Sequence, residues 1–208
     1  MRHPKNQIYH ICLLITLLLI YIWSFIKPSD IFTWFLEMLP VLIGLAVLLL
    51  TYRRFRLTDL IYTLIWVHGM ILLVGAHYTY AQVPLFDWIK DFFELSRNHY
   101  DRLGHFAQGF VPAMIAREVL IRTSPLRGSK WLMPLVVYVC LAISAIYELI
   151  EWLVAELTGS AAEAFLGTQG DIWDTQKDMA LCFFGASAAL FFLSTWHDRQ
   201  LKEIQTDA

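Results

Sequence analysis

The stretch IYHICLLITLLLIYIWSFI, residues 8–26, contains no Lys, Arg, Asp or Glu and is long enough to cross a lipid bilayer as a helix. It is too long for a cleaved signal peptide and lacks a small-residue cleavage site, so we expect a permanent transmembrane helix. The rest of the chain has the same character. Of its 208 residues, 58% are hydrophobic and only 16% charged, which excludes an ordinary soluble domain.

Five further apolar runs predict an all-α, polytopic membrane protein with six transmembrane helices. No internal repeat or linker divides the chain, so we expect a single integral membrane domain over residues 1–208. Between the third and fourth spans, LFDWIKDFFELSR (residues 85–97) separates apolar from charged residues at helical spacing, which predicts an amphipathic helix at the membrane interface. The six predicted spans are residues 8–26, 31–50, 57–76, 101–121, 131–157 and 175–196.

The positions of lysine and arginine predict the orientation in the membrane. If the N-terminus faces the cytoplasm, 11 of the 16 basic residues fall on the inner side and 5 on the outer side. Inner loops of membrane proteins are enriched in lysine and arginine. We therefore expect both termini to face the cytoplasm. The net charge of −2 gives no reason to expect a nucleic acid partner, and nothing in the sequence indicates the oligomeric state.

Polar side chains gather where the predicted spans meet the outer surface. The stretch NHYDRLGHFAQGF, residues 98–110, puts Asp101, His105 and Gln108 on one helix face. The fifth and sixth spans carry SAIYELIEW and GDIWDTQKD at the same level, and the third span ends there. The further polar residues expected at this surface are Glu148, Glu151, Asp174, Asp178 and His77.

Ionisable groups at membrane depth usually face the bundle interior and mark functional sites. Imidazole and carboxylate groups together suit zinc, manganese or iron, so a divalent metal is a possible cofactor. The candidate metal ligands are Asp101, His105, Glu148, Asp174, Asp178 and His77. The candidate catalytic residues are His105, Glu148, Glu151 and Asp101, and the candidate substrate-binding residues are Arg102, Gln108 and Lys177.

A simpler interpretation stays open for part of this set. Asp101 or Asp174 can act as a helix N-cap, and an ion pair with Arg102 or Lys177 can satisfy one of the deeper carboxylates. The segment TGSAAEAFLGTQGDIWD, residues 158–174, fits either a lid that folds back over the site or an ordinary loop.

Three motifs, YDRLGHF, YELIEW and GDIWDTQKDMA, resemble a domain-of-unknown-function family of bacterial inner membrane proteins, the YjdF family, over nearly the whole chain. The resemblance implies a multi-pass membrane protein and no particular activity. More distantly, the pattern is similar to VanZ-like proteins, with Asp178 where that pattern has asparagine. That similarity implies an association with glycopeptide resistance and the cell envelope. The residues that match the VanZ-like pattern are Asp101, His105, Phe106, Glu148 and Asp174.

Two classes of function follow from this group of polar residues at the outer surface. The first is a metal-dependent hydrolase or transferase that acts on a lipid or lipid-linked envelope substrate from the outer face. In it, Arg102 would bind a phosphate of the substrate. The second is an ion- or proton-coupled binding or transport protein. The inner halves of the predicted spans are almost wholly apolar apart from Glu118, which favours a one-sided pocket over a conduit. A non-catalytic membrane protein is the remaining alternative.

Overall fold

The computed structural model describes residues 4–159 and 163–206, and within these ranges it consists of helices joined by turns, with no strand. The all-helical architecture predicted from the sequence is therefore confirmed. The helices are α1 (Pro4–Phe25), α2 (Ile31–Thr51), α3 (Asp59–His77), α4 (Pro84–Phe92), α5 (Tyr100–Thr123), α6 (Leu132–Thr158), α7 (Glu163–Leu166) and α8 (Asp174–Thr206).

Five of these helices, α1, α2, α3, α6 and α8, are long and apolar enough to cross a membrane. They correspond to five of the six predicted spans. The remaining predicted span corresponds to α5, which has a similar length but buries Asp101, His105, Arg117 and Glu118. Because α5 packs against α3, α6 and α8, its surface is covered by protein and does not have to be apolar. A count of six membrane spans stays a prediction.

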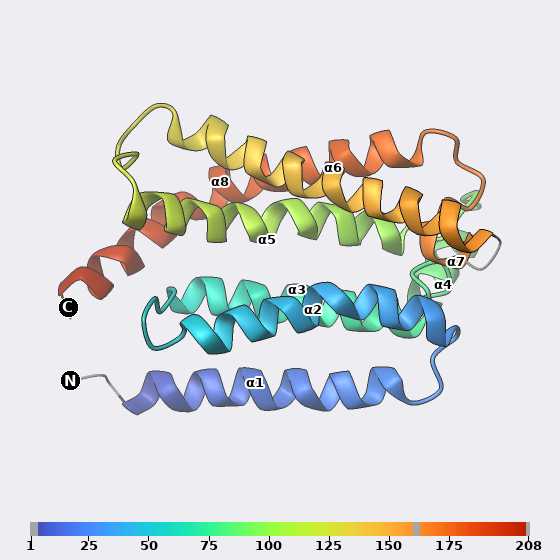
Figure 1. Ribbon diagram of the computed structural model, residues 1–208, viewed down its shortest axis with the longest axis horizontal. Coiled ribbons are helices and arrows are strands. Elements are labelled where there is room, and N and C mark those ends of the chain that lie inside the picture. The colour runs from blue at the N-terminus through green and yellow to red at the C-terminus, as the bar shows by residue number, and fades with distance from the viewer. Residues whose placement is uncertain (1–3, 160–162, 207–208) are drawn as a thin grey trace.

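The long helices run side by side in two groups (Figure 1). In the first group α3 packs against α1 and α2, and in the second α5 packs against α6 and α8. The contact between α3 and α5 joins the groups. The start of α1 and the end of α8 lie at one end of the bundle, which we call the terminal end (Figure 1). The short helices α4 and α7 lie at the opposite end, which we call the α4–α7 end.

Close contact between α5 and α8 is made possible by two glycines. A Cβ atom on Gly109 would lie 1.9 Å from the backbone oxygen of Cys182, and one on Gly185 would lie 2.1 Å from the backbone oxygen of Phe106. Small residues let membrane helices approach to backbone contact. Around this contact lies an apolar layer that includes Ala113, Met114, Cys140, Cys182 and Ala186.

On the terminal side of this layer, α5 and α8 share a buried polar network. Glu118 accepts hydrogen bonds from Arg122 at 2.5 Å and from the Thr58 backbone at 3.2 Å, and it lies 2.9 Å from Nε2 of His197. Arg117 contacts Nδ1 of His197 at 2.8 Å and Asp198 at 2.7 Å. The sequence predicted almost no polar groups in the inner halves of the spans apart from Glu118. Arg117 is a second charged group there, whereas Arg122, His197 and Asp198 lie just beyond the ends of the predicted spans.

The predicted interfacial helix corresponds to α4, which ends at Phe92 and not at residue 97. It ends there because Glu94 adopts a positive φ of 52°, which turns the chain inward. The large side chains of Leu85, Trp88 and Phe92 are exposed, as an amphipathic helix at a membrane surface requires. The interfacial position itself stays a prediction.

The glycine contact gives a stability test. We expect Gly109→Ala to lower the free energy of unfolding by about 3 kcal/mol or more, because the new methyl group meets backbone that has no room to move. Gly44→Ala on α2 is the matched control, since a Cβ there meets nothing within 4 Å. Denaturation of both variants with SDS in mixed micelles measures the difference. Equal stability of the two variants would contradict the close α5–α8 contact.

Candidate functional site

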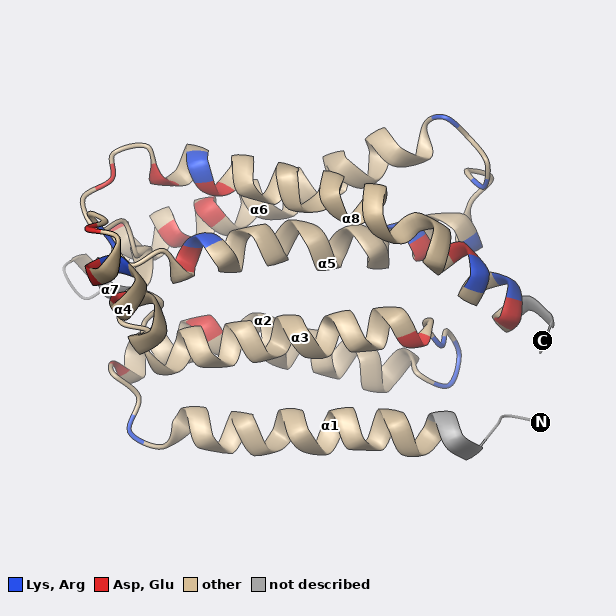
Figure 2. Cartoon of the chain, turned by 180° about the vertical axis from the view of Figure 1, so that it is seen from behind, with Lys and Arg blue, Asp and Glu red and all other residues tan. Residues whose placement is uncertain are grey.

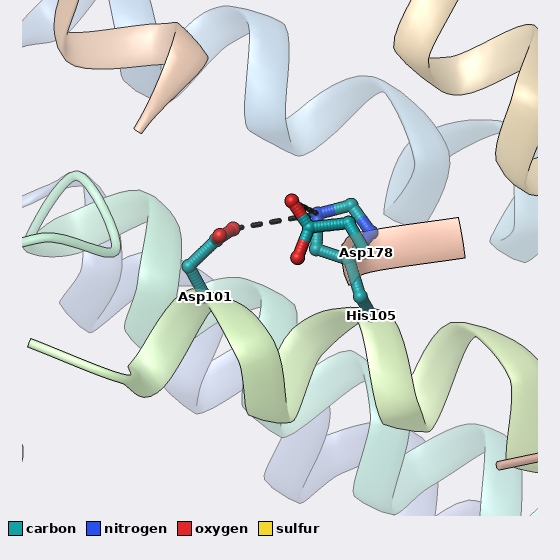
Figure 3. A group of neighbouring side chains, drawn as sticks. All are labelled: Asp101, His105 and Asp178. Carbon is teal, nitrogen blue, oxygen red and sulfur yellow. Dashed lines mark ion pairs between the residues drawn. The ribbon is translucent and has the colours of Figure 1, made fainter. Parts of the chain in front are cut away.

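Three buried side chains meet between α5 and α8 near the α4–α7 end (Figure 3). One ligand atom from each of Asp101, His105 and Asp178 lies within 4.8 Å of the other two. Nε2 of His105 is 3.4 Å from Asp101 Oδ1 and 4.0 Å from Asp178 Oδ2. Asp101 and His105 are one helical turn apart, so the sequence spacing predicted this pair, and α8 supplies the third group.

The other ring nitrogen of His105 contacts different partners. Nδ1 is 3.2 Å from Gln108 Oε1 and 3.8 Å from Glu148 Oε1. An amide oxygen only accepts hydrogen bonds, so Nδ1 carries a proton and donates a hydrogen bond to Gln108. In the neutral ring, Nε2 then presents a lone pair to the oxygens of Asp101 and Asp178. Three electron-rich atoms facing one another need a cation or a proton between them.

Two carboxylate oxygens beside this group have no hydrogen-bond partner in the described part of the chain. They are Oε1 of Glu148 and Oδ1 of Asp178, and both residues are buried. Buried polar atoms are nearly always satisfied, so such exceptions need an explanation. The predicted residues His105, Glu148, Asp101 and Asp178 are thus brought together, with two carboxylate oxygens left over to bind a ligand.

Sequence analysis missed Arg97, the residue that neutralises part of this site. Its guanidinium is buried and forms ion pairs with Asp174, with Asp101 at 3.3 Å and with Asp171 at 3.8 Å. Asp174, which we expected among the metal ligands, therefore pairs with Arg97 and lies outside the group of three around His105. Arg97 had been counted only as one of the outer basic residues.

The segment before α8 folds over the site, as a lid would. Arg97 donates to the carbonyl oxygens of Gly167 at 3.0 Å and Thr168 at 3.2 Å. The side chain of Gln169 makes two hydrogen bonds of 2.9 Å with the backbone of Asn98. Residues 160–162 of the candidate lid segment lie outside the described residues.

Two of the predicted substrate-binding residues lie nearer the surface. Arg102 and Lys177 both pair with Asp171, at 2.9 and 2.5 Å. The hydrogen bond from Lys177 and that from the Trp173 backbone hold the pKa of Asp171 below its usual value. Asp171 therefore stays ionised and keeps both cations at the rim of the site.

The structure does not bring His77 to the group around His105. Its Nδ1 contacts the backbone oxygen of Ser24 at 3.0 Å, and its ring packs on Trp23 with centroids 4.4 Å apart. His77 thus joins α3 to α1, away from the α5–α8 contact.

A cavity of about 200 Å³ opens beside His105, between α2, α3, α5 and α6. It is lined by Asp101, His105 and Gln108 and by two further carboxylates, the predicted Glu151 and the unexpected Glu37. Glu37 is buried in α2 and accepts a hydrogen bond of 3.2 Å from Tyr147. A lone carboxylate in the apolar run 31–50 is itself a signal of a site, which the sequence analysis did not use.

Acidic residues gather on several helices near the α4–α7 end (Figure 2).

Residues 9–199 match the family described as "Predicted membrane protein (DUF2238)". The chain is 52% identical to the inner membrane protein YjdF of Escherichia coli (strain K12) over 188 residues, which cover 90% of each protein. No solved structure matches the chain at a significant level.

The buried position of Arg97 predicts its effect on stability. We expect Arg97→Met to lower the free energy of unfolding by about 3–5 kcal/mol, because it leaves Asp101 and Asp174 buried without a counter-charge. Arg102→Met, five residues along the chain, removes a more exposed ion pair and should cost about 1 kcal/mol or less. SDS denaturation of both variants is the measurement. A larger loss in Arg102→Met than in Arg97→Met would contradict this account.

Proposed function

Because the chain belongs to the DUF2238 family of predicted membrane proteins, we propose a function at the bilayer: it holds one divalent metal ion and hydrolyses or transfers a group of a lipid or lipid-linked envelope substrate. The proposed ligands are Asp101, His105 and Asp178. One observation carries the proposal, namely that three buried ligand atoms from these residues converge within 4.8 Å. Histidine and carboxylate ligands suit zinc, manganese and iron.

The side chains around the three ligands have complementary roles. Gln108 accepts a hydrogen bond from Nδ1–H of His105. This bond orients the ring so that Nε2 faces Asp101 and Asp178. Arg97 holds Asp101 in place from its other side. A bound divalent ion supplies Lewis acidity and a water of lowered pKa. Glu148, which has an unpartnered oxygen 3.8 Å from Nδ1 of His105, would serve as the general base.

We also propose the orientation in which this site faces the outside of the inner membrane. The distribution of 11 inner against 5 outer basic residues supports this orientation, and the name of the E. coli relative supports the inner membrane as the location. In this orientation the terminal end of the bundle is cytoplasmic. Arg102 and Lys177, at the rim, then face the outer headgroup layer, where a phosphate of the substrate can displace Asp171. The distant similarity to VanZ-like proteins stays a prediction.

Ion- or proton-coupled transport is the second candidate, and one observation favours it. Buried ionisable groups lie at both ends of the α5–α8 pair, around His105 and around Glu118. The apolar layer of Met114, Cys140 and Cys182 separates the two groups. Protein reconstituted in vesicles should therefore show no proton or metal flux, and measurable flux would favour transport over the enzyme.

Elemental mass spectrometry tests the metal site. We expect detergent-purified protein, prepared without chelator, to contain about one zinc, manganese or iron per chain. His105→Ala and Asp178→Asn should each lose it, because each removes one of three ligands. His77→Ala is the control and should keep the metal, since His77 contacts Ser24 and Trp23.

Folding is checked by gel filtration of the same samples. Metal-free wild type that is well folded, or metal retained in both ligand variants, would contradict the proposal. Where metal is present, hydrolysis of envelope lipids by wild type and Glu148→Gln is compared next. We expect a loss of about 100-fold or more in Glu148→Gln, which removes a general base.

A further inference from the structure

The cavity beside His105 has features that the metal site does not explain. It extends away from Asp178 towards α2, α3 and α6, and its wall includes Glu37, Tyr80, Tyr147 and Glu151. Its volume of about 200 Å³ is below that of pockets for drug-sized ligands and suits a small polar group. Asp101 and His105 belong both to this wall and to the metal ligands, so the cavity and the metal site are continuous.

The Glu151 carboxylate is buried but has no partner. The residue is 8% exposed and lines the cavity, and in the described part of the chain its carboxylate forms no hydrogen bond or ion pair. Glu37 on the α2 wall is 6% exposed, and among the described residues its carboxylate accepts one hydrogen bond, from the Tyr147 hydroxyl. An unpaired carboxylate in the interior of a membrane protein is costly. Protons or a positively charged ligand can match such a pair, and the cavity beside the two glutamates has room for a ligand.

The charges of the wall determine the kind of ligand. Among the described residues that line the cavity there is no lysine or arginine, so a phosphate is not attracted into it. A second metal ion is also disfavoured, because only Asp101, His105 and Asp178 converge closely enough among the described residues. The rings of Tyr80 and Tyr147 suit an organic cation, which aromatic faces attract. Burial raises the pKa of Tyr80 well above its usual range, so its hydroxyl stays neutral.

Apolar residues of α2 and α6 form part of the cavity wall. Its lining includes Ile143, which is 42% exposed, and Pro40 on α2. Leu39 and Ile43 on α2, and Ile146 on α6, add exposed apolar surface beside it. In a membrane these residues contact acyl chains. A lipid can thus keep its chains in the bilayer while its headgroup enters sideways.

We propose that this cavity is an ammonium subsite for a lipid headgroup: Glu37 and Glu151 bind a primary ammonium group, with Tyr147 beside it. The inference rests on the proposed function and names its substrate class. A headgroup with an ammonium next to a phosphate places the ammonium between the two glutamates and the phosphate towards Asp101, His105 and Asp178. Aminophospholipids, with an ethanolamine-type headgroup, have this arrangement of charges.

Native mass spectrometry of the purified, metal-containing protein tests the subsite. The protein is equilibrated with equimolar phosphatidylethanolamine, phosphatidylglycerol and N-acetylated phosphatidylethanolamine, which keeps the phosphate but lacks the ammonium. We expect wild type to retain phosphatidylethanolamine about tenfold over the other two lipids, as one charge-assisted interaction provides. No preference in wild type would overturn the proposal without the need for any variant. Free ethanolamine is added in a second arm, and retention of ethanolamine with no preference among the lipids would assign the subsite to a soluble amine.

Substitution of both glutamates tests whether they cause the preference for phosphatidylethanolamine. In Glu37→Gln/Glu151→Gln we expect the three lipids to be retained about equally, because the amides keep the shape but lose the negative charge. Glu156→Gln, an exposed glutamate on α6, is the matched control and should behave as wild type. Metal content, measured on the same samples, should stay unchanged in all variants, since neither glutamate belongs to the ligand set. A double variant that keeps the lipid preference would overturn the subsite. Absence of metal from wild type would contradict the metal site separately.

Discussion

Buried carboxylates between membrane helices must be matched by positive charge, by protons or by a metal, and this requirement organises the α4–α7 end of the bundle. Arg97 supplies this positive charge for Asp101 and Asp174, and it also holds Gly167 and Thr168 over the site through their carbonyl oxygens. Among the described residues, Asp178, Glu148 and Glu151 pair with no lysine or arginine, and His105 alone faces Glu148 at 3.8 Å and Asp178 at 4.0 Å. The unmatched charge beside His105 is the reason to expect a bound cation.

The same requirement explains why the two ends of α5 differ. At the terminal end, Glu118 is matched by His197, Arg122 and the Thr58 backbone, so both of its carboxylate oxygens have partners and this network stabilises the fold. At the other end the matching is incomplete, although the side chains are equally buried. Incomplete networks are costly and persist where a ligand completes them. We therefore infer that the first network stabilises the fold and that the second is part of a ligand-binding site.

Much of this was predictable from the sequence, because apolar length and helical spacing are local properties. The runs around 8–26 and 31–50, and the pairing of Asp101 with His105, needed no tertiary information. Arg97 and Glu37 were missed because their roles depend on helices distant in sequence. Arg97 reaches Asp174, 77 positions away, and Glu37 meets Tyr147, 110 positions away. Spacing along one helix cannot show such partners.

The central claim is that a divalent ion lies between α5 and α8. Anomalous X-ray diffraction from crystals of the protein, recorded above and below the zinc, manganese and iron absorption edges, tests it most directly. The account predicts one anomalous peak within about 2.0–2.2 Å of Nε2 of His105 and of carboxylate oxygens from Asp101 and Asp178. A peak elsewhere, or well-ordered side chains with no peak between them, would contradict it.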